Sequence, residues 1–308
     1  MDFLPSYIKL NKTGELKRRV EMAWDMLRYC KLCARECGVN RLEGETGFCR
    51  SDDRIVVANF GRHFGEEAPL VGNCGSGTMF LANCNLSCVY CQNYDISQTS
   101  DGEEMGPEHL ARIMITLQVF GCHNVNFVSP THYVPQILKG LLIAVESGLE
   151  IPLVYNCGGY ESFETLKILD GIFDIYMPDI KYGDNGKAEK YSNAPGYFDA
   201  VKTAVSEMHR QVGDLVINSE GIAEKGLLIR HLVLPNNLSG TKKLMEFISG
   251  LSENSYMNIM DQYRPEYKAW EYPELSRRIT SEEYEKTIMM AEESGLKRGF
   301  GRGLGRRR

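Results

Sequence analysis

The chain has 308 residues, of which 43% are hydrophobic and 25% charged, and its net charge is −6. This composition is ordinary for a soluble globular protein, and no apolar run approaches the ~18 residues needed to span a bilayer. The first twenty residues lack the apolar stretch of a secretory signal, so we expect a cytoplasmic protein with no membrane partner.

Much of the positive charge lies at the C-terminus, where residues 297–308 hold six lysines and arginines. Without them the chain would carry a net charge of −12, and an acidic body argues against nucleic acid as a partner. The other residues of this stretch are mostly glycine and cannot form a core, so we predict a disordered, solubilising tail.

The character of the sequence changes at about residue 76. The first 29 residues are charged, with apolar positions at helical spacing, and predict a helix, whereas residues 30–75 are glycine-rich and irregular. From residue 76 onward, short β-type runs alternate with longer amphipathic stretches. The predicted strands are 78–82, 125–129, 152–156, 174–178, 231–235 and 258–262, and the predicted helices are 107–120, 134–147, 161–169, 197–211, 241–252 and 281–294.

This alternation predicts an α/β fold with a parallel sheet and right-handed crossovers. The βα units would form a partial (β/α)6 TIM-type barrel with a small N-terminal cysteine-rich segment in front of it. Residues 213–230 fall outside the alternation and are predicted to form a hairpin. We therefore divide the chain into an N-terminal helix with a cysteine-rich metal-binding segment (1–75), the partial barrel (76–296) and the tail (297–308). Polar residues follow each predicted strand, as expected if all the strand ends face one cavity.

One loop after the first barrel strand carries three cysteines, Cys84, Cys88 and Cys91, spaced C-x3-C-x2-C. Iron–sulfur clusters normally take four cysteines, so three thiolates would leave one iron without a protein ligand. An open metal position is where a substrate or cofactor binds. The alternatives are a Cys3His zinc site and a four-cysteine cluster completed by Cys74.

The same loop resembles the hallmark of the radical S-adenosylmethionine superfamily, C-x3-C-x-aromatic-C, with Tyr90 at the aromatic position. The resemblance extends over residues 76–296. It implies a [4Fe–4S] cluster on the three cysteines, with S-adenosylmethionine bound to the fourth iron. Cleavage of that cofactor would give methionine and a 5′-deoxyadenosyl radical, which abstracts hydrogen from a substrate. Within the superfamily the chain looks closest to activating enzymes of glycyl radical enzymes, especially to pyruvate formate-lyase-activating-like relatives.

The resemblance also implies residues around the cofactor. The sequence "MPDIK" is similar to the Met-x-Asp-x-Lys motif of the family, whose residues line the cofactor carboxylate and a cation site. The second strand of these relatives usually ends in Gly-Gly-Glu, and the matching place here begins at Ser129. Asn156 and Arg230 match the third and fifth strands. The predicted cofactor-binding residues are Tyr90, Ser129, Asn156, Met177, Asp179, Lys181 and Arg230.

A second group of cysteines near the N-terminus is spaced C-x2-C-x3-C-x11-C and comprises Cys30, Cys33, Cys37 and Cys49. Four thiolates close a metal site without an outside ligand. We favour a structural metal such as zinc, because a small glycine-rich segment has little core of its own. The alternative is an auxiliary [4Fe–4S] cluster that relays electrons.

The leading functional prediction is therefore a radical S-adenosylmethionine enzyme. Its expected partners are an electron donor of the flavodoxin or ferredoxin type and a protein or peptide substrate such as a glycyl radical enzyme, with a small-molecule substrate as the alternative. Two other classes stay open from the residues alone: a metal-dependent hydrolase or transferase on a barrel, and an iron–sulfur electron carrier or sensor.

Overall fold

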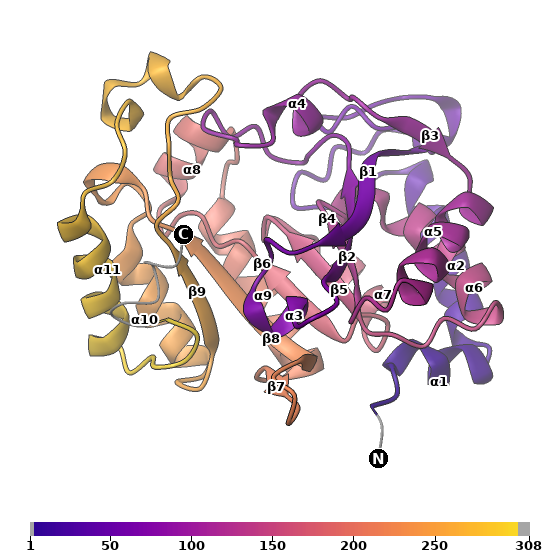
Figure 1. The fold of residues 1–308 in the computed structure, drawn as a ribbon. Coiled ribbons are helices and arrows are strands. Elements are labelled where there is room, and N and C mark those ends of the chain that lie inside the picture. Colours follow the sequence, from indigo (N-terminus) through magenta and orange to yellow (C-terminus); the bar gives the residue numbers. More distant parts are fainter. Residues whose placement is uncertain (1–2, 301–308) are drawn as a thin grey trace.

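The computed structural model describes residues 3–300, which form a mixed sheet with helices packed around it (Figure 1). The strand order is β3-β1-β2-β4-β5-β6-β8-β7, and β9 also pairs with β8. Neighbouring strands from β2 to β9 in the barrel part run parallel, which confirms the predicted partial barrel. These strands are β2 (Ser76–Leu81), β4 (Val125–Val128), β5 (Leu153–Cys157), β6 (Ile175–Pro178), β8 (Ala223–Leu232) and β9 (Tyr256–Met260).

The fifth barrel strand lies earlier in the sequence than predicted. The sequence pattern predicts it at 231–235, but β8 covers Ala223–Leu232. The predicted hairpin at 213–230 is present, because β7 (Val216–Ile217) pairs antiparallel with the start of β8. One strand therefore serves both the hairpin and the barrel. At Gly226 (φ +120°) an added Cβ would lie 2.4 Å from the Asp214 carbonyl oxygen, so this close crossing requires glycine.

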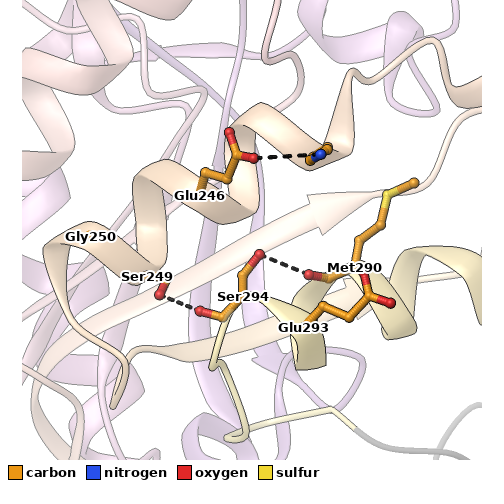
Figure 2. A pocket seen from close by; sticks show the side chains of 7 residues that line it. Glu246, Ser249, Gly250, Met290, Glu293 and Ser294 are labelled. Atoms are coloured by element: carbon orange, nitrogen blue, oxygen red, sulfur yellow. Dashed lines mark hydrogen bonds and ion pairs between the residues drawn. The ribbon is translucent and has the colours of Figure 1, made fainter.

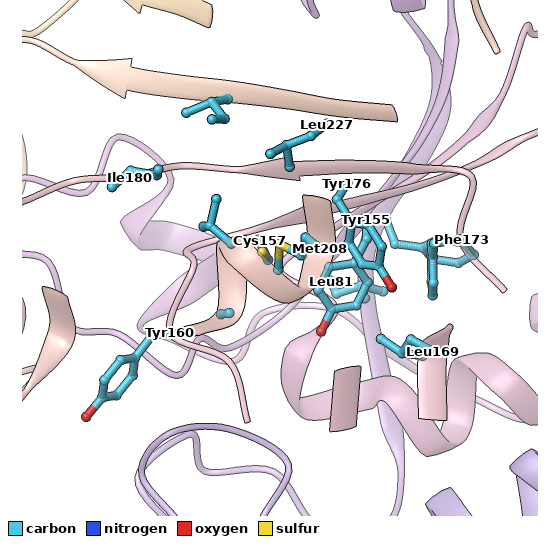
Figure 3. Packing of buried hydrophobic residues seen from close by; sticks show 14 of the residues in the cluster. Leu81, Tyr155, Cys157, Tyr160, Leu169, Phe173, Tyr176, Ile180, Met208 and Leu227 are labelled. Carbon is cyan, nitrogen blue, oxygen red and sulfur yellow. The ribbon is translucent and has the colours of Figure 1, made fainter. Parts of the chain in front are cut away.

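The helices between the strands cover the outer face of the sheet. Buried apolar side chains at helical spacing form one face of these helices, and this pattern made all of them except α8 predictable from the sequence. On the sheet, the rings of Tyr155 and Tyr176 pack edge-on with centroids 5.7 Å apart, and Phe173 lies 4.9 Å from Tyr155 (Figure 3). The helices are α5 (Pro107–Val119), α6 (Val134–Glu146), α7 (Phe163–Leu169), α8 (Asn185–Ser192), α9 (Tyr197–Val212), α10 (Thr241–Leu251) and α11 (Ser281–Glu293).

The N-terminal region packs on the barrel and extends its sheet. Helices α1 (Ser6–Lys12) and α2 (Glu15–Asp25) place Tyr7 and Leu16 in the same buried cluster as the barrel strands. Strand β1 (Ile55–His63) pairs antiparallel with β2 and with β3 (Glu103–Met105). The expected boundary at residues 75–76 therefore does not divide the hydrophobic core.

A short segment after β1 crosses the inner face of the sheet (Figure 1). Its helix α3 (Ala68–Val71) inserts Leu70 into an apolar cluster with Val154, Met177 and Leu228, from three barrel strands. This contact fills the part of the barrel interior that lies beneath the carboxyl ends of the strands. It also brings the two glutamates that precede α3 toward the carboxyl ends of the strands.

The described part of the chain includes only residues 297–300 of the predicted tail. Arg298 pairs with Tyr256 in an isolated bridge, and its guanidinium donates to the carbonyl oxygens of Asn254 and Leu215. These bonds fix a residue that composition alone assigned to the tail, while residues 301–308 lie outside the described part of the chain. Within residues 3–300, none of the helices has the length and apolar character to cross a membrane.

Candidate active site

The three cysteines lie on the loop between β2 and the short helix α4 (Tyr94–Ser97), at the carboxyl end of the first barrel strand. Polar groups approach each sulfur. The Leu86 N–H donates to Cys84 Sγ at 3.4 Å, and the Ser192 hydroxyl donates to Cys88 Sγ at 3.0 Å. Cys91 Sγ lies 3.2 Å from Ser97 Oγ. Such donors stabilise ligating thiolates, so the loop has the surroundings that a metal cluster requires.

Burial dominates the electrostatics of these thiols. It raises the pKa of Cys84 to about 12 and raises the pKa of Cys88, although the nearby Lys181 opposes the increase at Cys88. Both thiols are therefore protonated at neutral pH without a metal, and metal binding displaces the protons. In residues 3–300 no three His, Cys, Asp or Glu side chains are arranged to hold one metal ion. A cluster has a different requirement, since each thiolate ligates a separate iron.

Cys74 does not complete this site. It precedes β2, whereas Cys84 follows the strand, so the six residues of β2 separate the two cysteines. At about 3.3 Å per residue the strand is roughly 20 Å long, too long for both sulfurs to share one cluster. The four-cysteine alternative with Cys74 is therefore wrong.

A charged group forms at the ends of the next strands. Asp179, just after β6, accepts from Lys181 Nζ at 3.0 Å and from Arg230 Nε at 2.5 Å. Arg230, on β8, also donates to the Asn156 side-chain oxygen on β5 at 2.9 Å. Burial opposes ionisation of Asp179, but Arg230 and then Lys181 outweigh it and lower the Asp179 pKa to about 2. Asp179 is thus ionised and holds both cations in place.

Sequence reasoning missed two acidic residues that join this group from outside the barrel. Glu66 and Glu67 lie between β1 and α3, with carboxylate oxygens 3.4 and 3.7 Å from Arg230 Nη1. Burial raises the Glu66 pKa to about 7, although Arg230 counteracts it. Asn258, on β9, donates to Glu67 at 2.8 Å. No local motif marks these residues, because their partners lie in distant parts of the chain.

The other predicted cofactor residues occupy two environments. Ser129 follows β4 with a left-handed backbone (φ +60°), and its N–H donates to the Asn156 carbonyl oxygen at 2.9 Å. Tyr90 is buried, with its ring edge-on to Tyr182 and Tyr263. Met177 is buried in the apolar cluster beneath the charged group. Ser129 thus lies at the strand ends with Asn156, whereas Met177 lies deeper in the barrel.

A separate hollow of about 600 Å³ lies between α10 and α11 (Figure 2). Its walls include Glu246, Met290 and Ser294, and the Ser294 hydroxyl donates to the Met290 carbonyl oxygen at 2.8 Å. None of the predicted site residues lines it.

The cysteine loop and the charged strand ends lie inside the stretch that matches a known family. Residues 79–222 match the family model described as the radical SAM superfamily. An archaeal relative from Methanocaldococcus jannaschii, named uncharacterized protein MJ0674, is 38% identical over 300 residues, covering 94% of this chain and 81% of the relative. The chain belongs to the radical SAM superfamily. This membership favours radical chemistry over the hydrolase and electron-carrier alternatives.

Two further comparisons give similar proteins. A second Methanocaldococcus jannaschii protein, named uncharacterized protein MJ0808, is 25% identical over 295 residues, covering 86% of this chain and 81% of that protein. The crystal structure of Streptococcus suis SuiB bound to precursor peptide SuiA gives a TM-score of 0.48 at 14% identity. That match covers 71% of this chain and 46% of SuiB, so the chain spans less than half of SuiB.

The residues present fit the two cofactors typical of radical SAM enzymes. Cys84, Cys88 and Cys91 supply three sulfur donors on one loop, with hydrogen-bond donors or hydroxyls around the sulfurs. The cations Lys181 and Arg230 lie at the neighbouring strand ends, where they suit the carboxylate of S-adenosylmethionine. The three cysteines would hold the cluster, and the charged group would hold the amino-acid end of the cofactor.

Proposed function

We propose that this protein is a radical S-adenosylmethionine enzyme that activates a protein partner by abstracting hydrogen from a glycine of its backbone. When bound, the cluster supplies the electron that cleaves S-adenosylmethionine into methionine and the 5′-deoxyadenosyl radical that takes the hydrogen. Every other contribution comes from the chain, which binds the cofactor, orients it and excludes water.

One observation carries the proposal. The three-cysteine loop and the group of Asp179, Lys181 and Arg230 are linked, because the hydroxyl of Tyr182, next to Lys181, lies 2.8 Å from the Ser192 hydroxyl that donates to Cys88 Sγ. A carboxylate placed at Lys181 would therefore lie beside the thiols that hold the cluster. A lysine ammonium has three donors, so Lys181 can keep its bond to Asp179 and still bind that carboxylate.

Asp179 acts as a positioning residue in this scheme. Its two carboxylate oxygens accept from different cations, Lys181 on one side and Arg230 on the other. Charge-assisted hydrogen bonds of this kind fix the direction of long side chains as well as their charge. The Asp179 carboxylate therefore keeps two cations apart and aimed at the ends of the strands.

The shape of the sheet supports a large substrate. The parallel part ends at β9 on one side and continues through antiparallel β1 and β3 on the other, so strand pairing within residues 3–300 does not close the barrel. Such an opening could admit a loop of a protein partner to the strand ends. This support comes from fold-level analogy, and a small-molecule substrate is the competing outcome of the experiment.

The first experiment tests the radical step. Anaerobically reconstituted protein is incubated with S-adenosylmethionine and dithionite, and 5′-deoxyadenosine is measured. We expect it from the parent protein and from Cys74→Ala, whose cysteine lies at the opposite end of β2, and none from Cys88→Ala. Normal 5′-deoxyadenosine production by Cys88→Ala would show that the cluster assignment is wrong.

The second experiment tests the substrate. The reduced, cofactor-loaded protein is mixed with a candidate glycyl radical enzyme from the same organism, and the mixture is examined by electron paramagnetic resonance. We expect a persistent glycyl doublet. Turnover of a small metabolite without a protein radical would refute the activating role and leave the radical mechanism intact.

A further inference from the structure

The four N-terminal cysteines lie on a tightly turned segment outside the long helices. The Cys30 N–H donates to the Val39 carbonyl oxygen, and the Gly38 N–H donates back to the Cys30 carbonyl oxygen, both at 3.0 Å. Cys37 Sγ lies 3.9 Å from that same Cys30 carbonyl oxygen. This pair of backbone bonds folds the segment back on itself and places Cys37 against Cys30.

Gly47 brings the fourth cysteine to the same place. A Cβ added at Gly47 would lie 2.5 Å from Cys37 Sγ, so only glycine lets this part of the backbone approach the sulfur. The Arg50 N–H donates to the Gly47 carbonyl oxygen at 3.0 Å and closes a turn that contains the buried Cys49. Two sequence-distant parts of the segment therefore meet at Cys37.

Cys33 completes the group. The Glu36 N–H donates to its carbonyl oxygen at 3.1 Å, which turns the chain between Cys33 and Cys37. Cys33 is buried, and burial raises its pKa to about 12, with further contributions from the nearby Cys49 and Cys30. Backbone turns thus draw together a segment whose four cysteines are spread over 20 residues of sequence.

This group lies directly beside the three-cysteine loop. The Ala34 N–H and the Asn85 side-chain amide both donate to the Tyr160 carbonyl oxygen, at 3.4 and 2.8 Å. Arg35 Nε donates to the Asn85 carbonyl oxygen at 2.6 Å. The residues that follow Cys33 and Cys84 are therefore bound to the same carbonyl group, and Arg35 spans the two loops.

Arg35 also links the groups electrostatically. Its guanidinium lies 3.3 Å from the centre of the Phe48 ring, next to Cys49 in sequence, and it interacts with Cys33, Cys49 and Cys84. A half-buried cation between two sets of thiols reduces the cost of holding two anionic centres close together.

We propose that Cys30, Cys33, Cys37 and Cys49 bind a second [4Fe–4S] cluster, which passes electrons to the cluster on Cys84, Cys88 and Cys91. This replaces the structural zinc that the sequence favours, because no three such side chains in residues 3–300 are arranged around a single metal ion. Four thiolates occupy all four irons, so this cluster has no position for S-adenosylmethionine. In the transfer, a one-electron donor protein reduces the second cluster, which then reduces the first cluster and returns to its oxidised state. One electron moves in each step, and no bond or proton changes place.

The metal content of the N-terminal site is measured in a variant that lacks the three cysteines of the first cluster. In a Cys84→Ala/Cys88→Ala/Cys91→Ala variant, reconstituted anaerobically with iron and sulfide, we expect about four irons and four sulfides per chain. Dithionite reduction should give a cluster signal in electron paramagnetic resonance. Adding Cys37→Ser, at an exposed cysteine, should remove the iron and the signal, whereas adding Cys74→Ala should preserve both.

Three outcomes would overturn the second cluster. One zinc per chain without iron would identify a structural zinc site, and absence of any metal would show that these cysteines are not ligands. Iron that persists after Cys37→Ser would place the cluster elsewhere. Circular dichroism of the Cys37→Ser variant verifies that it is folded, so that lost iron is not lost structure.

The relay rests on the proposed function and is tested separately. In chains with an intact three-cysteine loop, the reduced signal of the first cluster is followed over time with either a flavodoxin or dithionite as donor. We expect Cys37→Ser to slow reduction by flavodoxin, while dithionite still supports 5′-deoxyadenosine formation. Unchanged flavodoxin kinetics would overturn the relay. Loss of 5′-deoxyadenosine in the parent protein would instead refute the proposed function.

Discussion

Replacing Arg230 by methionine should strongly destabilise the protein, and should do so in a pH-dependent way. Arg230 is the only cation that contacts Glu66 and Glu67 among the ion pairs of residues 3–300, and it shares Asp179 with Lys181. Methionine keeps much of the length of the side chain and removes its charge. The buried carboxylates would then be left without their main partner.

The magnitude follows from the pKa values. Lowering the Asp179 pKa from 3.8 to about 2 corresponds to roughly 2 kcal/mol of stability at neutral pH, and Arg230 is the largest favourable cause. Removing one partner of a buried ion pair typically lowers the free energy of unfolding by about 3–5 kcal/mol, because the other charge is left buried and unpaired. We therefore expect Arg230→Met to lower the free energy of unfolding at pH 8 by about 3–5 kcal/mol.

The loss should be smaller at pH 5. The Glu66 pKa is already about 7 with Arg230 present, so Glu66 is protonated at pH 5 and needs no cation. Removing the arginine also raises the Asp179 pKa toward the range of a buried, unpaired carboxyl group. At pH 5 the variant therefore holds one or two fewer unpaired carboxylates than at pH 8, and the loss in the free energy of unfolding should be smaller by roughly 1–2 kcal/mol.

Urea denaturation followed by circular dichroism at both pH values measures this effect. The control is Arg112→Met, because Arg112 is exposed on α5 and should contribute less than about 0.5 kcal/mol. The double variant Arg230→Met/Glu66→Gln should recover part of the loss at pH 8. A loss below about 1 kcal/mol at pH 8, or an equal loss at both pH values, would refute the electrostatic account.

Three further predictions concern stability. Because the Glu66 pKa is raised, the native state keeps a proton that the unfolded state releases above pH 4.5. The contribution of protonated Glu66 to the free energy of unfolding is therefore complete below pH 4.5 and is lost as the pH rises through about 7. Glu66→Gln should therefore gain up to about 3 kcal/mol relative to the parent between pH 4.5 and 8, whereas the exposed Glu285→Gln should show no such trend in urea titrations. Arg41 is fully buried and donates to the Asp52 and His132 carbonyl oxygens. Arg41→Met should therefore lower the free energy of unfolding by about 2–4 kcal/mol and speed proteolysis of the cysteine-rich segment. An unchanged cleavage rate would contradict this anchoring role. Ser129→Gly should raise stability by about 0.5–1 kcal/mol, because φ is +60° there, and a lower melting temperature would count against strain at this residue.

The sequence predicted most of the barrel because its signals are local. Helix α5 was predicted within a residue of its bounds, and strand β4 within one residue of its end, since periodicity and flanking turn residues are written in each segment. Strand β8 was placed too late because its first half also forms a hairpin with β7, and a sequence pattern does not state that one strand has two roles.

That three thiols share one loop was determined by the sequence alone, because the spacing C-x3-C-x2-C holds them within eight residues whatever surrounds them. Only the tertiary structure decided what lies around that loop. Glu66 and Asn258 reach Arg230 and Glu67 across 164 and 191 residues, and Arg35 reaches Asn85 across 50. Contacts of this kind depend on how the sheet curves around its interior, and the buried carboxylates there are stabilised by a cation from a different strand, Arg230 on β8.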